Sequence, residues 1–417
     1  MNEGAREADA QDEAKLQRSL GLGLSVLYGL GVTIGAGIYV LIAPMIARAG
    51  VHAPLAFLLS ALTMAPSAAT FAELSSRMPR SAGEATYVHA AFRSDALARL
   101  VGLLVIAVAI ISAATVSRGA AGYISVFVDV PAALIVGVVV LLLGAVTAWG
   151  IKESVAFAGI MTLIEVSGLL LIVVTGTIHH SSEFVHRLPE AWSGFGEAGA
   201  WAGVFGAVLL AFFAFTGFEG LANIAEEVKN PARTLPAAIF LTLVIVTLLY
   251  MLVVWVALIA VPHSELGYSP APLSLVYERV TGASPALITA IAIAATINGI
   301  VVFMVMGSRV IYGMAAQDLL PAWLAKVNRR THTPVIATAI VVAAVLILAL
   351  AFPIEDLAEA SSRVTLGVFA FVNAALIKLK MDAVPPPAGS FTVSAWVPVM
   401  GLAASLALLA SELLPRL

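Results

Sequence analysis

Cysteine and charged residues are scarce in this sequence. Cysteine is absent from all 417 residues, which excludes disulfides, thiolate nucleophiles and cysteine metal ligands. Charged residues make up only 11% of the chain, whereas an average soluble domain carries roughly 25%. Hydrophobic residues make up 61%, and the mean hydropathy is +1.01. A soluble core of this size would need a polar surface that the chain does not contain, so we predict an all-α polytopic membrane protein.

Several nucleotide-binding and catalytic motifs are also missing. No Gly-Lys dipeptide occurs, which excludes a P-loop and ATP as a driving force bound to this chain. Gly29-Leu-Gly31-Val-Thr-Ile lacks the third glycine of the dinucleotide fingerprint, and neither HExxH nor Gly-x-Ser-x-Gly is present. His179, His180 and His186 cluster in one loop, where solvated histidines are a simpler interpretation than a weak metal site. We therefore predict no cofactor, no metal and no nucleic-acid partner.

Apolar runs long enough to cross a bilayer recur along the whole chain. Eleven spans are predicted, at about 20–47, 53–75, 97–127, 131–149, 154–178, 199–225, 236–261, 285–314, 335–353, 356–379 and 393–413. With a cytoplasmic tail over 1–19, fifteen of the 22 Lys and Arg residues fall in inner segments and four in outer ones. This asymmetry predicts a cytoplasmic N-terminus and, with eleven spans, an outer C-terminus.

Glycine-rich stretches interrupt the first and the sixth predicted spans. The first span contains Gly31-Val-Thr-Ile-Gly-Ala-Gly37, and the sixth is interrupted at Thr216-Gly217 and at Gly220. Taken alone, the first stretch favours close helix packing through small residues. The two stretches occupy corresponding places, however, if the first ten spans form two repeats of five. Paired glycine-interrupted helices at matched positions indicate a transporter site between inverted repeats.

Four segments carry a family resemblance. The segment Phe213-Ala-Phe-Thr-Gly-Phe-Glu219 and its continuation to Pro236 resemble the sixth-helix signature of the amino acid–polyamine–organocation (APC) permeases. Further similarity to this superfamily lies at 31–37, 71–92 and 308–321, most of all to bacterial members of the cationic amino acid transporter branch. The resemblance implies a LeuT-like fold of five-plus-five inverted repeats with broken helices 1 and 6. The repeats would cover 20–178 and 199–379, followed by helix 11 at 393–413, while the twelfth helix usual in the family is missing.

The two breaks predict where a zwitterion would bind. A half-helix that starts near Gly35 would present free amides of Ile34 to Ile38 to a carboxylate. A half-helix that ends near Ala214–Phe215 would present free carbonyls to an ammonium group. Phe215 and Phe218 could form an aromatic lid, and the resemblance favours Phe218 for this role, although either could be an ordinary lipid- or bundle-facing residue. The predicted substrate-binding residues are Thr33, Ile34, Gly35, Ala36, Gly37, Phe215, Thr216, Gly217, Phe218 and Asn298. Asn298 could instead form an interhelical hydrogen bond.

Ionisable side chains within the spans are the other candidates, since they are costly in a bilayer. Glu165 occupies the place where the resemblance leads us to expect a lysine in proton-coupled relatives. A buried carboxyl group suits a proton carrier, and a structural carboxylate paired with an arginine or a polar group is the equal alternative. Glu219, Arg118 and Arg363 could form gates, although structural pairing inside the bundle is the simpler interpretation.

These observations predict a secondary active transporter of amino acids in the cytoplasmic membrane, working by alternating access with proton symport. Its partners would be an amino acid, a proton and the lipid bilayer, while the oligomeric state stays open. The third span contains no acid, whereas the resemblance leads us to expect a carboxylate there in some cation-selective relatives. This difference favours neutral substrates over arginine or lysine. The alternatives are an exchanger of amines, polyamines or amino acids, and a polytopic membrane enzyme. The enzyme would need a cluster of polar catalytic residues near one interface, and the sequence contains no such cluster.

Overall fold

The chain folds into a bundle of helices. The computed structural model describes residues 18–35, 37–79, 83–150, 155–192, 198–331 and 333–411. Within these ranges the only β-type pairing is an isolated parallel bridge between Leu20 and Val228. The helices that occupy the predicted spans are α2 (Leu22–Ile34), α3 (Gly37–Ala49), α4 (Ala53–Arg77), α6 (Asp95–Ile124), α7 (Ala132–Trp149), α8 (Val155–His179), α10 (Ala198–Phe215), α11 (Pro231–Ala260), α14 (Ala286–Ala316), α15 (Val335–Ala351), α16 (Ile354–Met381) and α17 (Trp396–Ser411).

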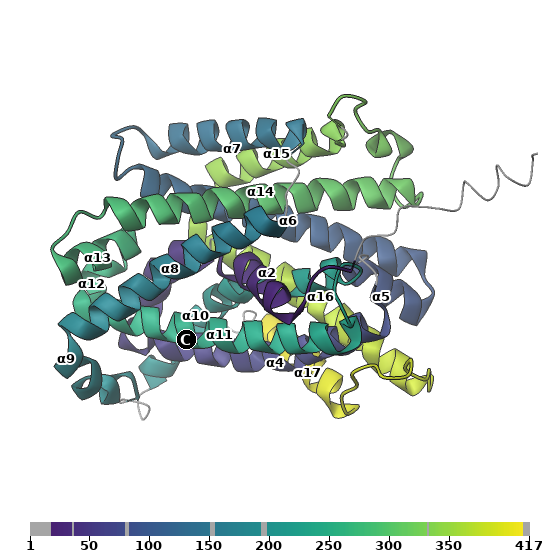
Figure 1. Cartoon of the computed structure of the whole chain (residues 1–417), viewed down its shortest axis with the longest axis horizontal. Coiled ribbons are helices and arrows are strands. Elements are labelled where there is room, and N and C mark those ends of the chain that lie inside the picture. The colour runs from purple at the N-terminus through teal and green to yellow at the C-terminus, as the bar shows by residue number, and fades with distance from the viewer. Residues whose placement is uncertain are drawn as a thin grey trace, which may run out of the picture.

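These helices include eight candidate membrane spans, judged by length and apolar composition within the described ranges. Three further apolar helices, α2, α15 and α17, are shorter. Short helices lie at the two ends of the bundle: α9 (Ser181–His186), α12 (His263–Leu266) and α13 (Pro272–Thr281) at one end, and α5 (Gly83–Phe92) at the other (Figure 1). Every predicted span therefore contains helix, and the chain is a multi-pass membrane protein.

Both predicted helix breaks are present. The first span divides into α2 and α3, with Gly35 at the C-terminal end of α2. The sixth span divides into α10 and the 3-10 segment η3 (Phe218–Ile224). Gly217 between them has φ +125°, a conformation that side-chain-bearing residues rarely adopt. A Cβ atom on Gly217 would also lie 2.5 Å from the carbonyl oxygen of Val32, so glycine is required where the two breaks meet.

The packing brings together helices that are distant in sequence. The helix α2 packs against η3, α3 against α10, α4 against α11, α6 against α14 and α7 against α15. Figure 1 shows α7 and α15 side by side along one edge of the bundle, next to α14. The outer helix α7 leaves Leu134, Val138, Leu141 and Leu142 exposed, as expected for a surface that contacts lipid chains. The broken helices lie instead in the buried core.

Candidate functional site

A small cavity lies between the two breaks. Its volume is about 20 Å³, room for roughly one water molecule. Five predicted site residues line it: Thr33, Gly35, Gly37, Thr216 and Asn298. The other lining residues are Gly31, Val32, Val116, Phe213, Gly299, Val302 and Phe303. The cavity is thus walled by the first break, the end of α10, and the facing helices α6 and α14.

The first break presents both a helix start and an unpartnered hydroxyl to this region. The helix α3 begins at Gly37, so the first N–H groups of α3 have no acceptor within their own helix. The buried Thr33 Oγ1 has no hydrogen-bond partner among the described residues. Ile34 is the last residue of α2, so its amide belongs to α2 and not to the start of α3. Its side chain is fully buried. Ala36 lies outside the described residues.

Glu165 does not line the cavity, but one hydrogen bond connects it to a residue that does. The Asn298 Nδ2 atom donates to Glu165 Oε1 at 3.2 Å, and this bond joins α14 to α8. The second carboxylate oxygen, Oε2, is buried and has no hydrogen-bond partner among the described residues. No lysine or arginine of the described chain forms an ion pair with Glu165 in this structure. The carboxyl group is therefore paired with a cavity-lining amide and keeps one oxygen free.

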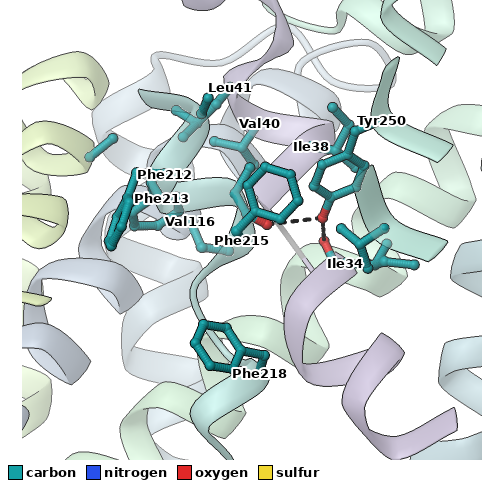
Figure 2. Packing of buried hydrophobic residues seen from close by; sticks show 14 of the residues in the cluster. Ile34, Ile38, Val40, Leu41, Val116, Phe212, Phe213, Phe215, Phe218 and Tyr250 are labelled. Atoms are coloured by element: carbon teal, nitrogen blue, oxygen red, sulfur yellow. Dashed lines mark hydrogen bonds between the residues drawn. The ribbon is translucent and has the colours of Figure 1, made fainter. Parts of the chain in front are cut away.

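Tyr250 on α11 joins the carboxyl-terminal ends of both broken helices. Its hydroxyl donates toward the carbonyl oxygens of Ala214 at 3.0 Å, Thr33 at 3.1 Å and Ile34 at 3.5 Å. Figure 2 shows this hydroxyl between Ile34 and the end of α10 beside Phe215, with its hydrogen bonds dashed. The Ala214 carbonyl, predicted as an acceptor for an ammonium group, is thus occupied by a phenol.

The two candidate lid residues lie in separate aromatic clusters. Phe215 is fully buried against Phe57 and Tyr250, with ring centroids 6.0 and 5.5 Å away. Phe218 is fully buried against Phe71 and Phe369, at 5.8 and 5.6 Å. Figure 2 shows Phe218 well separated from Phe215 along the chain that follows α10. Neither is among the residues that line the cavity; the lining aromatic of this segment is Phe213.

The remaining predicted charges do not line the cavity. Glu219 Oε2 accepts a hydrogen bond from the Gly217 amide at 2.8 Å and so stabilises the second break. Arg118 donates to the Ala349 carbonyl at 2.8 Å near the end of α15. Arg363 forms an ion pair with Glu359 at 2.6 Å, and Glu359 also pairs with Arg48 at the end of α3.

Sequence reasoning missed most of the apolar wall and one polar residue. Val116, Val302 and Phe303 carry no signal that distinguishes them from lipid-facing residues of an apolar span. Phe213 lies inside the sixth-helix motif but next to two more conspicuous aromatics. Tyr250 could have been noticed, because a buried hydroxyl within an apolar span needs an acceptor.

Comparison with known proteins identifies the family. The model of a family described as "Amino acid permease" matches residues 22–414, which include the whole cavity wall. The chain belongs to this amino acid permease family. Members of this family are transporters, so the protein is a transporter of the APC superfamily and not an enzyme.

Three relatives illustrate the range of this family. The branched-chain amino acid permease BcaP of Bacillus subtilis is 29% identical over 89% of this chain and 83% of the relative. The vacuolar cationic amino acid transporter 2 of Arabidopsis thaliana is 31% identical over 89% of this chain, which spans only 61% of that protein. A methylthioribose transporter of Bacillus subtilis is 29% identical over 94% of this chain and 87% of the relative. The names of these relatives give different substrates, so the substrate of this chain must be argued from its own cavity.

Proposed function

We propose that this protein is a secondary active transporter of neutral amino acids that works by alternating access with proton symport. Its place would be the cytoplasmic membrane, with the N-terminus inside. The observation that carries this proposal is that one cavity is walled by both helix breaks. The start of α3 supplies amide donors for a carboxylate, and the carboxyl-terminal ends of α2 and α10 supply acceptors for an ammonium group.

The lining residues favour an uncharged, apolar substrate side chain. Val116, Phe213, Val302 and Phe303 supply apolar surface, and none of the described lining residues carries a charge. A cationic side chain would require a carboxylate to compensate for its desolvation. The cavity is too small to hold an amino acid in this conformation, so binding requires the surrounding helices to move. We expect leucine, valine or alanine to be better substrates than arginine, lysine or a polyamine.

Glu165 is the residue proposed to carry the coupling proton. Its hydrogen bond from Asn298 links it to a residue that lines the cavity, and its free Oε2 atom can accept a proton. Protonation of Oε2 would add a donor to the carboxyl group and leave Oε1 as an uncharged acceptor, which weakens its hydrogen bond from the cavity-lining amide of Asn298. This linkage supports a mechanism in which proton binding and substrate binding favour each other.

Contacts on both sides of the cavity support alternating access. Arg48, at the end of α3, contacts both Glu359 of α16 and the Gly206 carbonyl of α10, which closes the predicted outer side. On the predicted inner side, Leu20 before α2 pairs with Val228 after η3. The pairing of α2 with η3, α4 with α11, α6 with α14 and α7 with α15 relates each helix to the one five spans later. This regularity supports the proposed five-plus-five repeat, in which one part of the bundle rocks against another.

Uptake into proteoliposomes tests the proposal. Purified protein would be reconstituted and supplied with labelled leucine, alanine, arginine, lysine and a polyamine, each with and without an inwardly directed proton gradient. We expect uptake of leucine or alanine above protein-free liposomes, increased by the gradient. Uptake that requires the same amino acid inside the vesicle and ignores the gradient would identify an exchanger. Absence of uptake of every compound would overturn the proposal.

A further inference from the structure

Tyr250 occupies an unusual position for a single hydroxyl group. Carbonyl oxygens of Thr33 and Ile34 from the first break, and of Ala214 from the second, surround its Oη atom at 3.0 to 3.5 Å. A phenol has one proton to donate, so it cannot fully satisfy three buried acceptors at once. The set of acceptors is therefore better matched to a group with several donors than to the tyrosine that fills it.

The surroundings increase this mismatch. The helices α2 and α10 both end at these acceptors, and the carboxyl-terminal end of each helix carries a partial negative charge. Tyr250 and Phe215 are fully buried, and Phe57 covers the ring of Tyr250 at a centroid distance of 5.3 Å, so the acceptors lie in a dry environment. Two of the three carbonyls lie at or next to the cavity wall. Thr33 lines the cavity, and Ala214 follows the lining residue Phe213 in the chain.

We propose that the Tyr250 hydroxyl stands in for the substrate's ammonium group in the empty transporter. It holds the carbonyl acceptors of the two breaks until an amino acid arrives, and the ammonium group, with its three donors, then displaces it. This inference rests on the proposed amino acid transport and adds a positioning residue to it. The phenol keeps the acceptors from being left unpaired when the site is empty, and it competes with the substrate for them.

Competition gives the Tyr250→Phe variant an unusual expected effect. Removal of the hydroxyl keeps the ring and its contacts with Phe57 and Phe215, but it leaves the empty site without a donor. Leucine then binds without first displacing a competitor. We expect the Kd for leucine to fall by about five- to thirty-fold, the factor that one lost hydrogen bond of ordinary strength represents. A hydroxyl that only maintained the structure would weaken leucine binding when removed.

The experiment measures equilibrium binding of labelled leucine to purified full-length wild type, Tyr250→Phe and Tyr123→Phe. Tyr123 is the matched control, because its buried hydroxyl donates to one carbonyl, that of Tyr39, at 2.7 Å, and to none of the carbonyls of Thr33, Ile34 and Ala214 that Tyr250 contacts. Tighter binding by Tyr250→Phe alone supports the inference. Unchanged or weaker binding by Tyr250→Phe overturns it, provided that the wild type binds leucine. A wild type that binds and transports no amino acid overturns the proposed function instead.

A second measurement uses the wild-type protein and so does not depend on the variant folding. Infrared difference spectra of protein with ring-labelled tyrosine report the hydrogen bonding of the phenol groups. We expect a shift in the tyrosine C–O band when leucine is added, and none with 4-methylpentanoate, which has the same chain and carboxylate without the amino group. Identical tyrosine bands before and after addition of leucine would contradict the displacement.

Discussion

Gly35 and Gly37 differ in what an added side chain would meet. A Cβ atom on Gly37 would lie 2.8 Å from the Ala214 Cα atom, so even alanine would push α3 away from α10. A Cβ atom on Gly35 would lie 3.3 Å from the Gly31 carbonyl oxygen, which is tight but requires a much smaller shift. Both glycines line the cavity. Gly37 therefore serves packing as well as the proposed site, whereas Gly35 tests the site more cleanly.

We predict that Gly35→Ala weakens leucine binding about tenfold, because the methyl group would keep the substrate from approaching the backbone closely, with a smaller loss of thermal stability than in Gly37→Ala. Gly37→Ala should lower both binding and stability. Leucine titration and thermal unfolding of the two purified variants measure the difference. Normal leucine affinity in Gly35→Ala would argue against a substrate carboxylate at this break.

Glu165 provides the test of proton coupling. The Glu165→Gln variant keeps the size of the side chain and an oxygen that can accept from Asn298, but it cannot exchange a proton. We expect uptake driven by the proton gradient to fall at least tenfold, while exchange of internal for external leucine continues. Uptake in proteoliposomes at several external pH values measures this. Gradient-driven uptake that persists in the variant would exclude Glu165 as the proton carrier.

Glu84 lies on the short helix α5, outside the predicted spans. Its buried carboxyl group should make the stability of the protein depend on pH. Burial raises the pKa of the Glu84 carboxyl above its ordinary value of 4.5. A raised pKa in the folded state means that the charged form destabilises the fold. Stability therefore decreases as the pH rises from the ordinary value through the raised one, and then levels off.

The Glu84→Gln variant should remove this contribution. We expect it to be more stable than the wild type above that pH range, by a few degrees in Tm, and equally stable at pH values below the ordinary pKa of glutamate. Thermal unfolding of both proteins across the pH range measures the difference. A variant that is less stable than the wild type at every pH would show that the carboxylate makes a favourable contact.

For individual residues, the sequence predicted some that line the cavity and could not predict others. Thr33, Gly35, Gly37, Thr216 and Asn298 line the cavity as the broken-helix interpretation requires. Glycine and intramembrane polar residues stand out because each is costly in an ordinary apolar helix. Apolar residues such as Val116 are not costly there, so only the fold can separate a cavity wall from a lipid-facing surface. The functional roles of all these residues stay predictions.

The broken helices were the most predictable elements, and their connections to other helices were the least. Three glycines in seven residues identified the end of α2, and Thr216-Gly217 identified the end of α10. Arg48, in contrast, carries no sequence signal of its role, because its partner Glu359 is 311 positions away. Long-range ion pairs of this kind depend on how the helices pack, which one sequence does not specify.

The contacts among Arg48, Glu359 and Arg363 predict how the outer side opens. Glu359 is almost fully buried and pairs with both arginines, so replacement by glutamine removes the charge that holds α3 to α16. The absence of native cysteine makes a single Val116→Cys probe in the cavity wall unambiguous. We expect Glu359→Gln to increase labelling of this cysteine by an impermeant thiol reagent added outside, by about five- to thirty-fold.

Glu265→Gln is the matched control, because Glu265 forms an exposed pair with Arg279 at 2.5 Å and an exposed pair contributes little to stability. Its labelling rate should equal that of the parent Val116→Cys protein. Equal labelling rates in Glu359→Gln and its parent would mean that these charges hold no outer gate.

For the whole molecule, composition was sufficient to predict the class of protein, and sequence motifs were sufficient to predict the family. A chain with 61% hydrophobic and 11% charged residues can bury its surface only in a bilayer, and its helices fall in the predicted ranges. The proposed repeat, the orientation of the termini and the coupling ion concern how helices are arranged and how they move. Packing of the first four spans, each against the span five places later, supports the repeat. Coupling depends on a free energy between two sites, which transport and binding experiments measure.

The central claim is that the two helix breaks hold one amino acid between them. An experimental structure of the purified protein with leucine tests it most directly. We predict leucine in an enlarged cavity, its carboxylate at the amides that begin α3 and its ammonium group at the carbonyls of Thr33 and Ala214, with the Tyr250 hydroxyl moved away. Leucine bound elsewhere, or bound in this cavity in the opposite orientation, would contradict the account.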